Sequence, residues 1–245
     1  WLDTPVVAAI VAAVVGAGLF MRMQRRADDP MLALDLFRSR TFSGGNAVTL
    51  ISYLVSAGVF FFVVVHLQST LGYKPAAAGA ALMPLYIIML IGSPLAGRIA
   101  DRVGTRIPMV AGLGVLAVGV WWISTIGVGS RYLTGVLPAM GVFSIGLALM
   151  GAPLTIAVLG AVGDQDQGVA SGINNTVGQL AGLLMIAVLP AAAGLAGTGF
   201  DDPTFAQGFE RAMHICAGLA VVAAVIAATT IRSSHEQQPS PRMGP

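Results

Sequence analysis

The stretch Gly97-Arg98-Ile99-Ala100-Asp101-Arg102-Val103-Gly104-Thr105-Arg106 lies between two long apolar runs. It gathers Arg98, Asp101, Arg102 and Arg106 in a chain that has only 13 Lys and Arg and 11 Asp and Glu. A charged side chain at the centre of a bilayer costs about 2.5–3.5 kcal/mol on insertion scales. The sequence therefore predicts that this stretch forms a tight polar turn at a membrane surface and joins two spanning helices.

The composition of the chain also indicates a membrane protein. Hydrophobic residues make up 56% of the 245 residues and charged residues only 10%, against about 25% charged residues in soluble domains. Because the apolar residues come in runs of about 20, the predicted fold class is an all-α membrane protein. The net charge of +2 does not indicate a nucleic-acid partner, since the basic residues lie in membrane loops and form no continuous patch.

Six apolar segments are expected to cross the membrane, at residues 44–67, 76–96, 107–127, 132–162, 169–196 and 205–231. The fourth and fifth are longer than one crossing needs. We expect them to protrude or to bend, with proline kinks available at Pro138, Pro153 and Pro190. Together, residues 44–231 are predicted to form one six-helix bundle.

The flanking regions are predicted to differ from this bundle. Residues 1–23 are expected to be part of one extra transmembrane helix, and residues 24–43 a cytoplasmic amphipathic linker in the plane of the interface. Residues 232–245 are polar, contain proline, and are expected to be a disordered cytoplasmic tail. Since the chain opens on Trp1 without a signal peptide, we expect it to be a fragment of a longer protein.

Lys and Arg residues are unevenly distributed between the two sides of the predicted membrane. One side holds only Lys74, Arg131 and Arg211, whereas the remaining basic residues fall on alternate connections and the C-terminal tail. By the positive-inside rule, the 97–106 turn and the C-terminus are expected to lie in the cytoplasm of a multi-pass cell-membrane protein. Trp121 and Trp122 then fall near the outer end of their helix, as an aromatic belt requires.

Polar residues inside the spans form the second signal. On the first span of the bundle one helical face carries four of them, Asn46, Thr49, Tyr53 and Ser56. On the fifth span, Asn174, Asn175 and Gln179 cluster near two pairs of glycines, Gly168/Gly172 and Gly178/Gly182. These side chains are candidates for lining a cavity, and interhelical hydrogen bonding is the equal alternative. Methionines in the spans fit an adaptable cavity or ordinary packing (Met83, Met89, Met150 and Met185).

Several classes of chemistry lack their residues in this sequence. Every Asp and Glu lies in a loop or at a span end, so a proton-coupling carboxylate is expected outside this chain. The sequence has no phosphate-binding loop, nucleophile elbow or metal-ligand spacing, and a single cysteine, Cys216. We therefore expect no enzyme activity, no metal and no cofactor. His66 and His214 are expected to be membrane-interface residues.

The 97–106 stretch also has a mechanical interpretation. Gly97 would let a helix end pack closely, and Gly104 would supply the positive φ of a sharp reversal. Asp101 would accept hydrogen bonds from the first amides of the following helix. Arg102 and Arg106 would pair with carboxylates or lipid headgroups. Such a cluster would hold two helices together in one state and release them in another.

The residues Gly97, Asp101, Arg102, Gly104 and Arg106 resemble the signature cytoplasmic loop of the major facilitator superfamily. The segments 82–85 and 93–97 and the linker at 30–38 resemble the fourteen-span drug:proton antiporters of that superfamily. The resemblance implies that the chain is the C-terminal half of such a transporter, preceded by part of an extra helix. It also implies that the loop takes part in conformational gating. An Arg that many relatives carry near Gly178 is missing here.

The function implied by the resemblance is proton-coupled efflux of hydrophobic or cationic drugs by alternating access. The expected partners are these small molecules, protons, membrane lipids and the missing N-terminal half. A facilitator for a sugar, an organic acid or a peptide is the first alternative, and a non-transporting helical membrane module is the second. The sequence does not identify the substrate, the oligomeric state, or whether the whole protein has fourteen or twelve spans.

Overall fold

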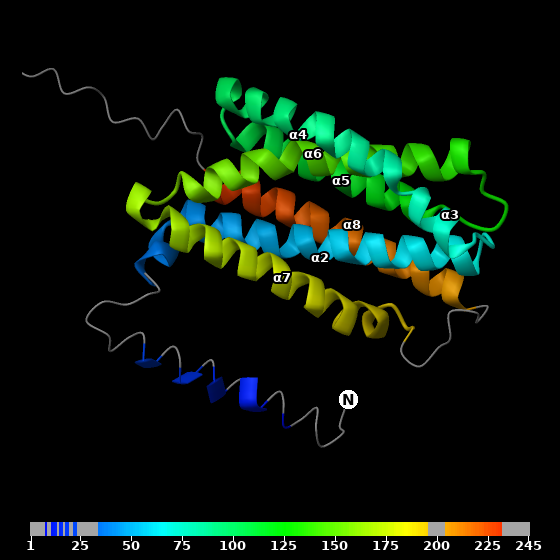
Figure 1. Ribbon diagram of the computed structural model, residues 1–245, viewed down its shortest axis with the longest axis horizontal. Coiled ribbons are helices and arrows are strands. Elements are labelled where there is room, and N and C mark those ends of the chain that lie inside the picture. Colours follow the sequence, from blue (N-terminus) through cyan, green and yellow to red (C-terminus); the bar gives the residue numbers. More distant parts are fainter. Residues whose placement is uncertain are drawn as a thin grey trace, which may run out of the picture.

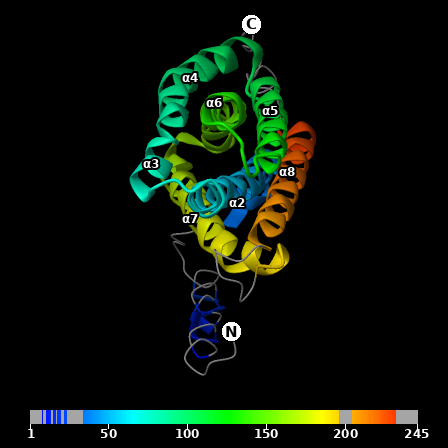
Figure 2. The ribbon, with the colours of Figure 1, turned by 90° about the vertical axis from the view of Figure 1, so that its right-hand side faces the viewer.

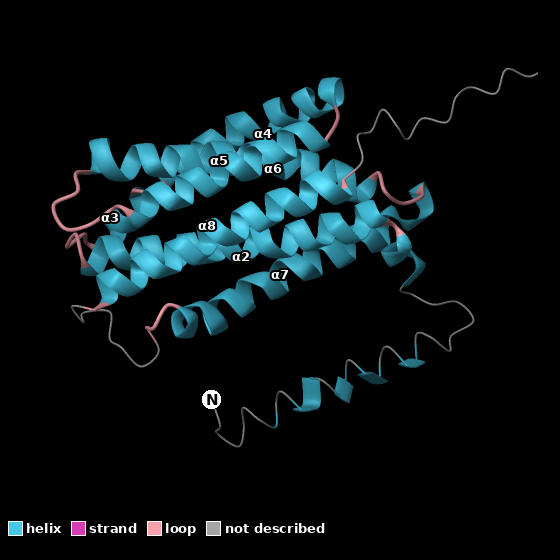
Figure 3. Ribbon diagram, turned by 180° about the vertical axis from the view of Figure 1, so that it is seen from behind, coloured by secondary structure: helices cyan, strands magenta, loops and turns pink. Residues whose placement is uncertain are grey.

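The computed structural model of the chain describes residues 34–195 and 204–231, with scattered helical residues between positions 8 and 23. Within these residues the fold is all-helical (Figure 3). The long helices are α2 (Arg40–Ser69), α4 (Met83–Val103), α5 (Arg106–Ser124), α6 (Leu137–Leu159), α7 (Gln167–Ala192) and α8 (Phe205–Thr230). Shorter elements are Leu34–Arg38, α3 (Pro75–Ala80), Tyr132–Val136 and Asp164–Asp166. The expectation for the tail at 232–245 lies outside the described residues, and most of that for 1–23 does too.

The described part of the chain has 6 helices long and apolar enough to cross a membrane, which confirms the predicted fold class. Two of the expected spans each consist of two successive helical elements, and a proline lies in the first turn of the second element. The segment expected at 76–96 consists of α3, which begins at Pro75, followed by α4, which carries Pro84 in its first turn. The segment expected at 132–162 begins with a π-helical turn at Tyr132–Val136, and Pro138 lies in the first turn of α6.

The six spans form two units of three consecutive helices, and the two units pack against each other through equivalent pairs of helices. The first unit contains α2, α4 and α5, and the second contains α6, α7 and α8. The first helix of each unit packs against the second and third helices of the other, α2 against α7 and α8, and α6 against α4 and α5. Figures 1 and 2 show the result, with α2 between α7 and α8 and with α6 between α4 and α5. Helices α5 and α8 then contact each other, as do α2 and α6.

The α5–α6 contact depends on glycines that let two backbones touch. A Cβ atom added to Gly112 would lie 2.7 Å from the backbone nitrogen of Met150. A Cβ added to Gly119 would collide with the backbone of Phe143, and one added to Gly146 with that of Leu116. Gly112 and Gly119 are seven residues apart and so lie on one helical face. This pair of helices is therefore interlocked along its length.

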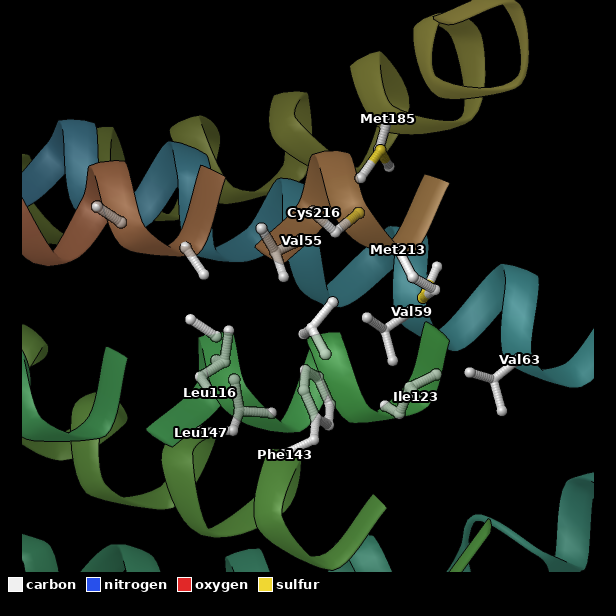
Figure 4. Close-up of a cluster of buried hydrophobic side chains, with 14 of the residues drawn as sticks. Val55, Val59, Val63, Leu116, Ile123, Phe143, Leu147, Met185, Met213 and Cys216 are labelled. Carbon is white, nitrogen blue, oxygen red and sulfur yellow. The ribbon is translucent and has the colours of Figure 1, made fainter. Parts of the chain in front are cut away.

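The core lies where α2, α5, α6 and α8 meet. Figure 4 shows Val55, Val59 and Val63 of α2 facing Leu116 and Ile123 of α5, with Phe143 of α6 beside them. These six side chains are at most 2% exposed. Their packing keeps α2 and α6 in fixed positions, and these two helices also contribute walls to the site described below.

The turn within the 97–106 stretch is shorter than the ten residues that the sequence predicts. Helix α4 continues through Gly97, Asp101 and Arg102 to Val103, and α5 starts at Arg106, so the turn consists of Gly104 and Thr105 alone. Gly104 has φ 82°, as predicted for a sharp reversal. The charged residues are exposed on helical backbone, because a helix that projects past the hydrocarbon layer can hydrate its charges without unwinding.

Candidate functional site

A cavity of about 700 Å³ lies between α2, α4, α6 and α7. Its lining is contributed by Tyr53, Ser56, Ala57, Phe60, Tyr86, Met89, Leu90, Leu147, Met150, Gly151, Gly178, Gln179 and Gly182. None of these lining residues carries a charge. The volume falls within the range of pockets that hold drug-sized ligands, which is about 300–1,000 Å³.

Aromatic rings and methionines project from the cavity walls between small residues. Tyr53 and Phe60 are seven residues apart on α2, a rise of about 10 Å along the helix, with Ser56 and Ala57 between them. The Phe60 ring stacks on Tyr86 of α4 at a centroid distance of 6.5 Å and packs edge-on against Phe143 at 6.0 Å. Aromatic faces and polarisable thioethers suit flat apolar molecules, and the faces also attract cations.

The polar face of α2 is divided between two environments. Asn46 and Thr49 are buried and do not line the cavity. The Asn174 side-chain amide of α7 donates hydrogen bonds to Asn46 Oδ1 at 3.2 Å and to Thr49 Oγ1 at 2.7 Å. These three residues, which we call the polar bridge, join α2 to α7. Asn46 and Thr49 thus make interhelical hydrogen bonds, whereas Tyr53 and Ser56 of the same face line the cavity.

Along α7 the candidate residues also separate. Gln179 lines the cavity, whereas Asn175 is exposed and lies outside the lining. Of the four glycines, Gly178 packs against the ring of Tyr53, and a Cβ added to Gly168, Gly172 or Gly182 would meet no atom within 4 Å. Among the methionines, Met89 and Met150 line the cavity, Met185 is buried in the core, and Met83 is exposed.

The cavity also contains residues that the sequence analysis did not identify. Phe60 and Tyr86 were not among the candidates because aromatic residues inside a span are usual in helix packing. No local pattern distinguishes a ring that faces a cavity from one that faces lipid. Helices α2 and α4 both pack against α6, and this arrangement brings Phe60 and Tyr86 together.

Within the described residues, the charged side chains of the 97–106 stretch do not form the helix cap or the ion pairs that the sequence predicts. Asp101 lies in the last turn of α4, and Thr105 precedes α5 without a side-chain capping hydrogen bond. The Asp101 carboxylate therefore does not accept hydrogen bonds from the first amides of α5. The ion pair found among the described residues joins Arg38 to Asp35, and it includes neither Arg102 nor Arg106.

Gly97 also differs from the expectation. A Cβ added there would lie 3.9 Å from that of Ala152, an ordinary contact. The close approach of α4 to α6 occurs at Gly92, where an added Cβ would lie 2.9 Å from the Cβ of Ala148.

His66 lies in the last turn of α2 and is buried. Its Nε2 lies 2.8 Å from the carbonyl oxygen of Ile126 and its Nδ1 lies 3.1 Å from Thr70 Oγ1. Its ring stacks on Phe209 of α8 at a centroid distance of 3.8 Å. With a proton on Nε2, the ring satisfies both partners, so His66 ties the end of α2 to the segment after α5 and to α8. His214 is exposed, with Nε2 3.4 Å from Ser124 Oγ.

Comparisons with known proteins show which families and relatives this chain resembles. Residues 4–186 match the sequence profile of the Major Facilitator Superfamily. The chain is 30% identical to the multidrug resistance protein Stp of Mycobacterium tuberculosis over 189 residues, which is 77% of this chain and 35% of Stp. It is 31% identical over 201 residues to the cephamycin export protein CmcT of Amycolatopsis lactamdurans, covering 81% of this chain and 41% of CmcT.

A third relative and a solved structure extend the comparison. The tetracenomycin C resistance and export protein of Streptomyces glaucescens is 30% identical over 196 residues, with 77% of this chain and 35% of that protein covered. A bacterial homologue of the human drug peptide transporters PepT1 and PepT2 superposes with a TM-score of 0.67 at 18% identity, covering 84% of this chain and 44% of that one. The chain thus spans less than half the length of these relatives. It belongs to the Major Facilitator Superfamily.

Proposed function

We propose that this chain is the C-terminal half of a secondary transporter that exports hydrophobic or cationic small molecules by alternating access. The observation that carries the proposal is the uncharged cavity between α2, α4, α6 and α7, with its aromatic and methionine walls. Relatives named for multidrug resistance and for antibiotic export support the same substrate class. A transporter rather than an enzyme is also what membership of this superfamily supports.

The lining argues against a carrier of sugars, organic acids or peptides. Such substrates carry several hydroxyl or charged groups, and each one taken from water needs a polar partner in the site. The described lining offers Gln179, Ser56 and two tyrosine hydroxyls, and Ser56 already donates its hydroxyl proton to the Ser52 carbonyl at 2.8 Å. Flat apolar cations need fewer directed partners and interact with Tyr53, Phe60 and Tyr86 through their ring faces.

The complete transporter is proposed to include the part of its relatives' length that this chain does not span. Alternating access requires two halves that rock about a site between them. The carboxylate that couples transport to protons is proposed to lie in that other half. The turn between α4 and α5 is proposed to face the cytoplasm, together with the C-terminus, in the cell membrane.

The test of this function is dye efflux by the full-length protein in a host strain deleted for its own exporters. Cells that produce it should accumulate less ethidium than cells with an empty vector, and a protonophore should abolish the difference. Efflux that persists in the protonophore would contradict proton coupling. Transport of lactose or of a dipeptide without any transport of ethidium would contradict the substrate class.

The residues Gly97, Asp101, Arg102, Gly104 and Arg106 are proposed to act as a latch that forms in one conformation and opens in the other. Asp101 makes no hydrogen bond within the described chain, so its carboxylate is available to a partner outside these residues. The Asp101→Asn variant should slow efflux by about tenfold, which is about 1.4 kcal/mol on a barrier, at unchanged expression and melting temperature. Asp164→Asn, an exposed aspartate before α7, is the matched control and should export like the wild type. Normal efflux by Asp101→Asn would contradict the latch.

A further inference from the structure

The ring of Tyr53 lies against the backbone of α7 at one particular residue. A Cβ atom added to Gly178 would lie 2.9 Å from Tyr53 Cδ1 and 2.9 Å from Tyr53 Cε1. A real Cβ does not approach an aromatic carbon so closely, so the ring occupies the space that any other residue at position 178 would fill. Gly178 itself is buried, whereas Tyr53 is 51% exposed and lines the cavity.

This contact forms one end of the cavity. In the polar bridge, Thr49 and Asn46 lie one and two turns before Tyr53 on α2, and Asn174 lies one turn before Gly178 on α7. The cavity lining begins at Tyr53 and Gly178 and continues along the same helices to Phe60 and Gly182. The Tyr53 ring is thus the end wall of the cavity beside the polar bridge.

A side chain at position 178 would move this wall in a definite direction. The α7 backbone at Gly178 lies against the ring, and the ring also lines the cavity. Rotation about its χ1 and χ2 bonds away from a methyl group at position 178 therefore takes the ring into the cavity space. Such a movement reduces the cavity volume and covers the space beside Ser56, three residues further along α2.

We propose that Gly178 determines the substrate size limit of the transporter by allowing the Tyr53 ring to lie directly against the α7 backbone. This inference rests on the proposed export function, and it adds the residue that sets which members of the substrate class are accepted. A glycine here gives the cavity its full length. An alanine is expected to shorten it from the Tyr53 end, so that larger molecules lose more affinity than smaller ones.

The chain offers a matched control one turn further along α7. Gly182 lines the same cavity, yet a Cβ added to it would meet no atom within 4 Å. Gly178→Ala and Gly182→Ala therefore introduce the same methyl group into the same helix and the same cavity. They differ in whether that methyl group displaces Tyr53.

The functional test compares efflux of ethidium with efflux of the larger dye rhodamine 6G by the full-length protein. Gly178→Ala should lower the rhodamine-to-ethidium efflux ratio by about tenfold, the size of effect that one methyl group has in a filled pocket. Gly182→Ala should lower the ratio much less, because its methyl group does not displace Tyr53. Adding Tyr53→Ala to Gly178→Ala should restore it, because the displaced ring is then absent. An equal ratio in both alanine variants, or no restoration in the double variant, would overturn the inference.

A second measurement reads the ring position without transport. Ser56→Cys is introduced into a full-length protein without other cysteines, and its labelling by N-ethylmaleimide is compared with labelling by fluorescein-5-maleimide. Gly178→Ala should slow the larger reagent more than the smaller one, and Gly182→Ala should slow neither. Unchanged labelling would overturn the placement of the ring. Failure of the wild type to export either dye, with labelling as expected, would instead contradict the proposed function.

Discussion

The α5–α6 contact and the α2–α7 contact use glycine for opposite purposes. Between α5 and α6, Gly112, Gly119 and Gly146 bring backbone against backbone, and α5 contributes no residue to the cavity lining. Between α2 and α7, Gly178 instead makes room for a side chain, and the rest of the contact includes the hydrogen bonds of the polar bridge. The first contact is a framework, and the second borders the cavity.

This difference shows how a chain with few polar residues can combine rigidity with a binding site. Apolar surface does not hold helices together in lipid as it does in water, so packing and hydrogen bonds must do so. Packing by glycine fills space and suits the framework. A cavity wall must leave space. Hydrogen bonds hold α7 to α2 at one end of the cavity, and Met185 and Leu189 of α7 pack against Gly58 of α2 further along.

The largest effect is expected from breaking the framework. Gly119→Ala places a methyl group against the backbone of Phe143, which has no side-chain torsion through which to move away. The helices must separate, and over-packing of this kind costs about 1–3 kcal/mol. The melting temperature of the purified full-length protein should fall by several degrees. Gly114→Ala on the same helix, where an added Cβ meets nothing within 4 Å, should leave it unchanged. Equal melting temperatures for the two variants would show that α5 and α6 are not interlocked there.

A smaller effect is expected from breaking the polar bridge. Asn174→Ala removes two interhelical hydrogen bonds, and such bonds in membranes average about 0.6 kcal/mol each. The free energy of unfolding, measured by SDS titration, should therefore fall by about 1 kcal/mol. Asn175→Ala, the exposed neighbour on the same helix, should change it little. If the two variants are equally stable, the bridge does not join α2 to α7.

Much of the fold could be predicted from local sequence. Runs of apolar residues indicated all six spans, and Gly104 marked the reversal between α4 and α5 correctly. The length of that turn was predicted wrongly because charge was taken as the end of a helix. The α4 backbone remains helical beyond the apolar run, through Asp101 and Arg102.

The site could be predicted only in part, because it depends on which helices become neighbours. The spacing of Asn46, Thr49, Tyr53 and Ser56 identified a special face of α2, but no local rule divides that face between a helix contact and a cavity. His66 shows the same limit, since its partners Ile126 and Phe209 are distant in sequence. The contact of Tyr53 with Gly178 likewise requires the pairing of α2 with α7.

The central claim is that the cavity between α2, α4, α6 and α7 binds the transported molecule. Gln179 and Asn175 test it most directly, since both are exposed amides one turn apart on α7 and only Gln179 lines the cavity. Each is replaced by cysteine in a full-length protein without other cysteines, and labelling by N-ethylmaleimide is measured with and without ethidium. Ethidium is predicted to slow labelling of Gln179→Cys and to leave Asn175→Cys unchanged. Labelling of Gln179→Cys that is unaffected by saturating ethidium would contradict the account.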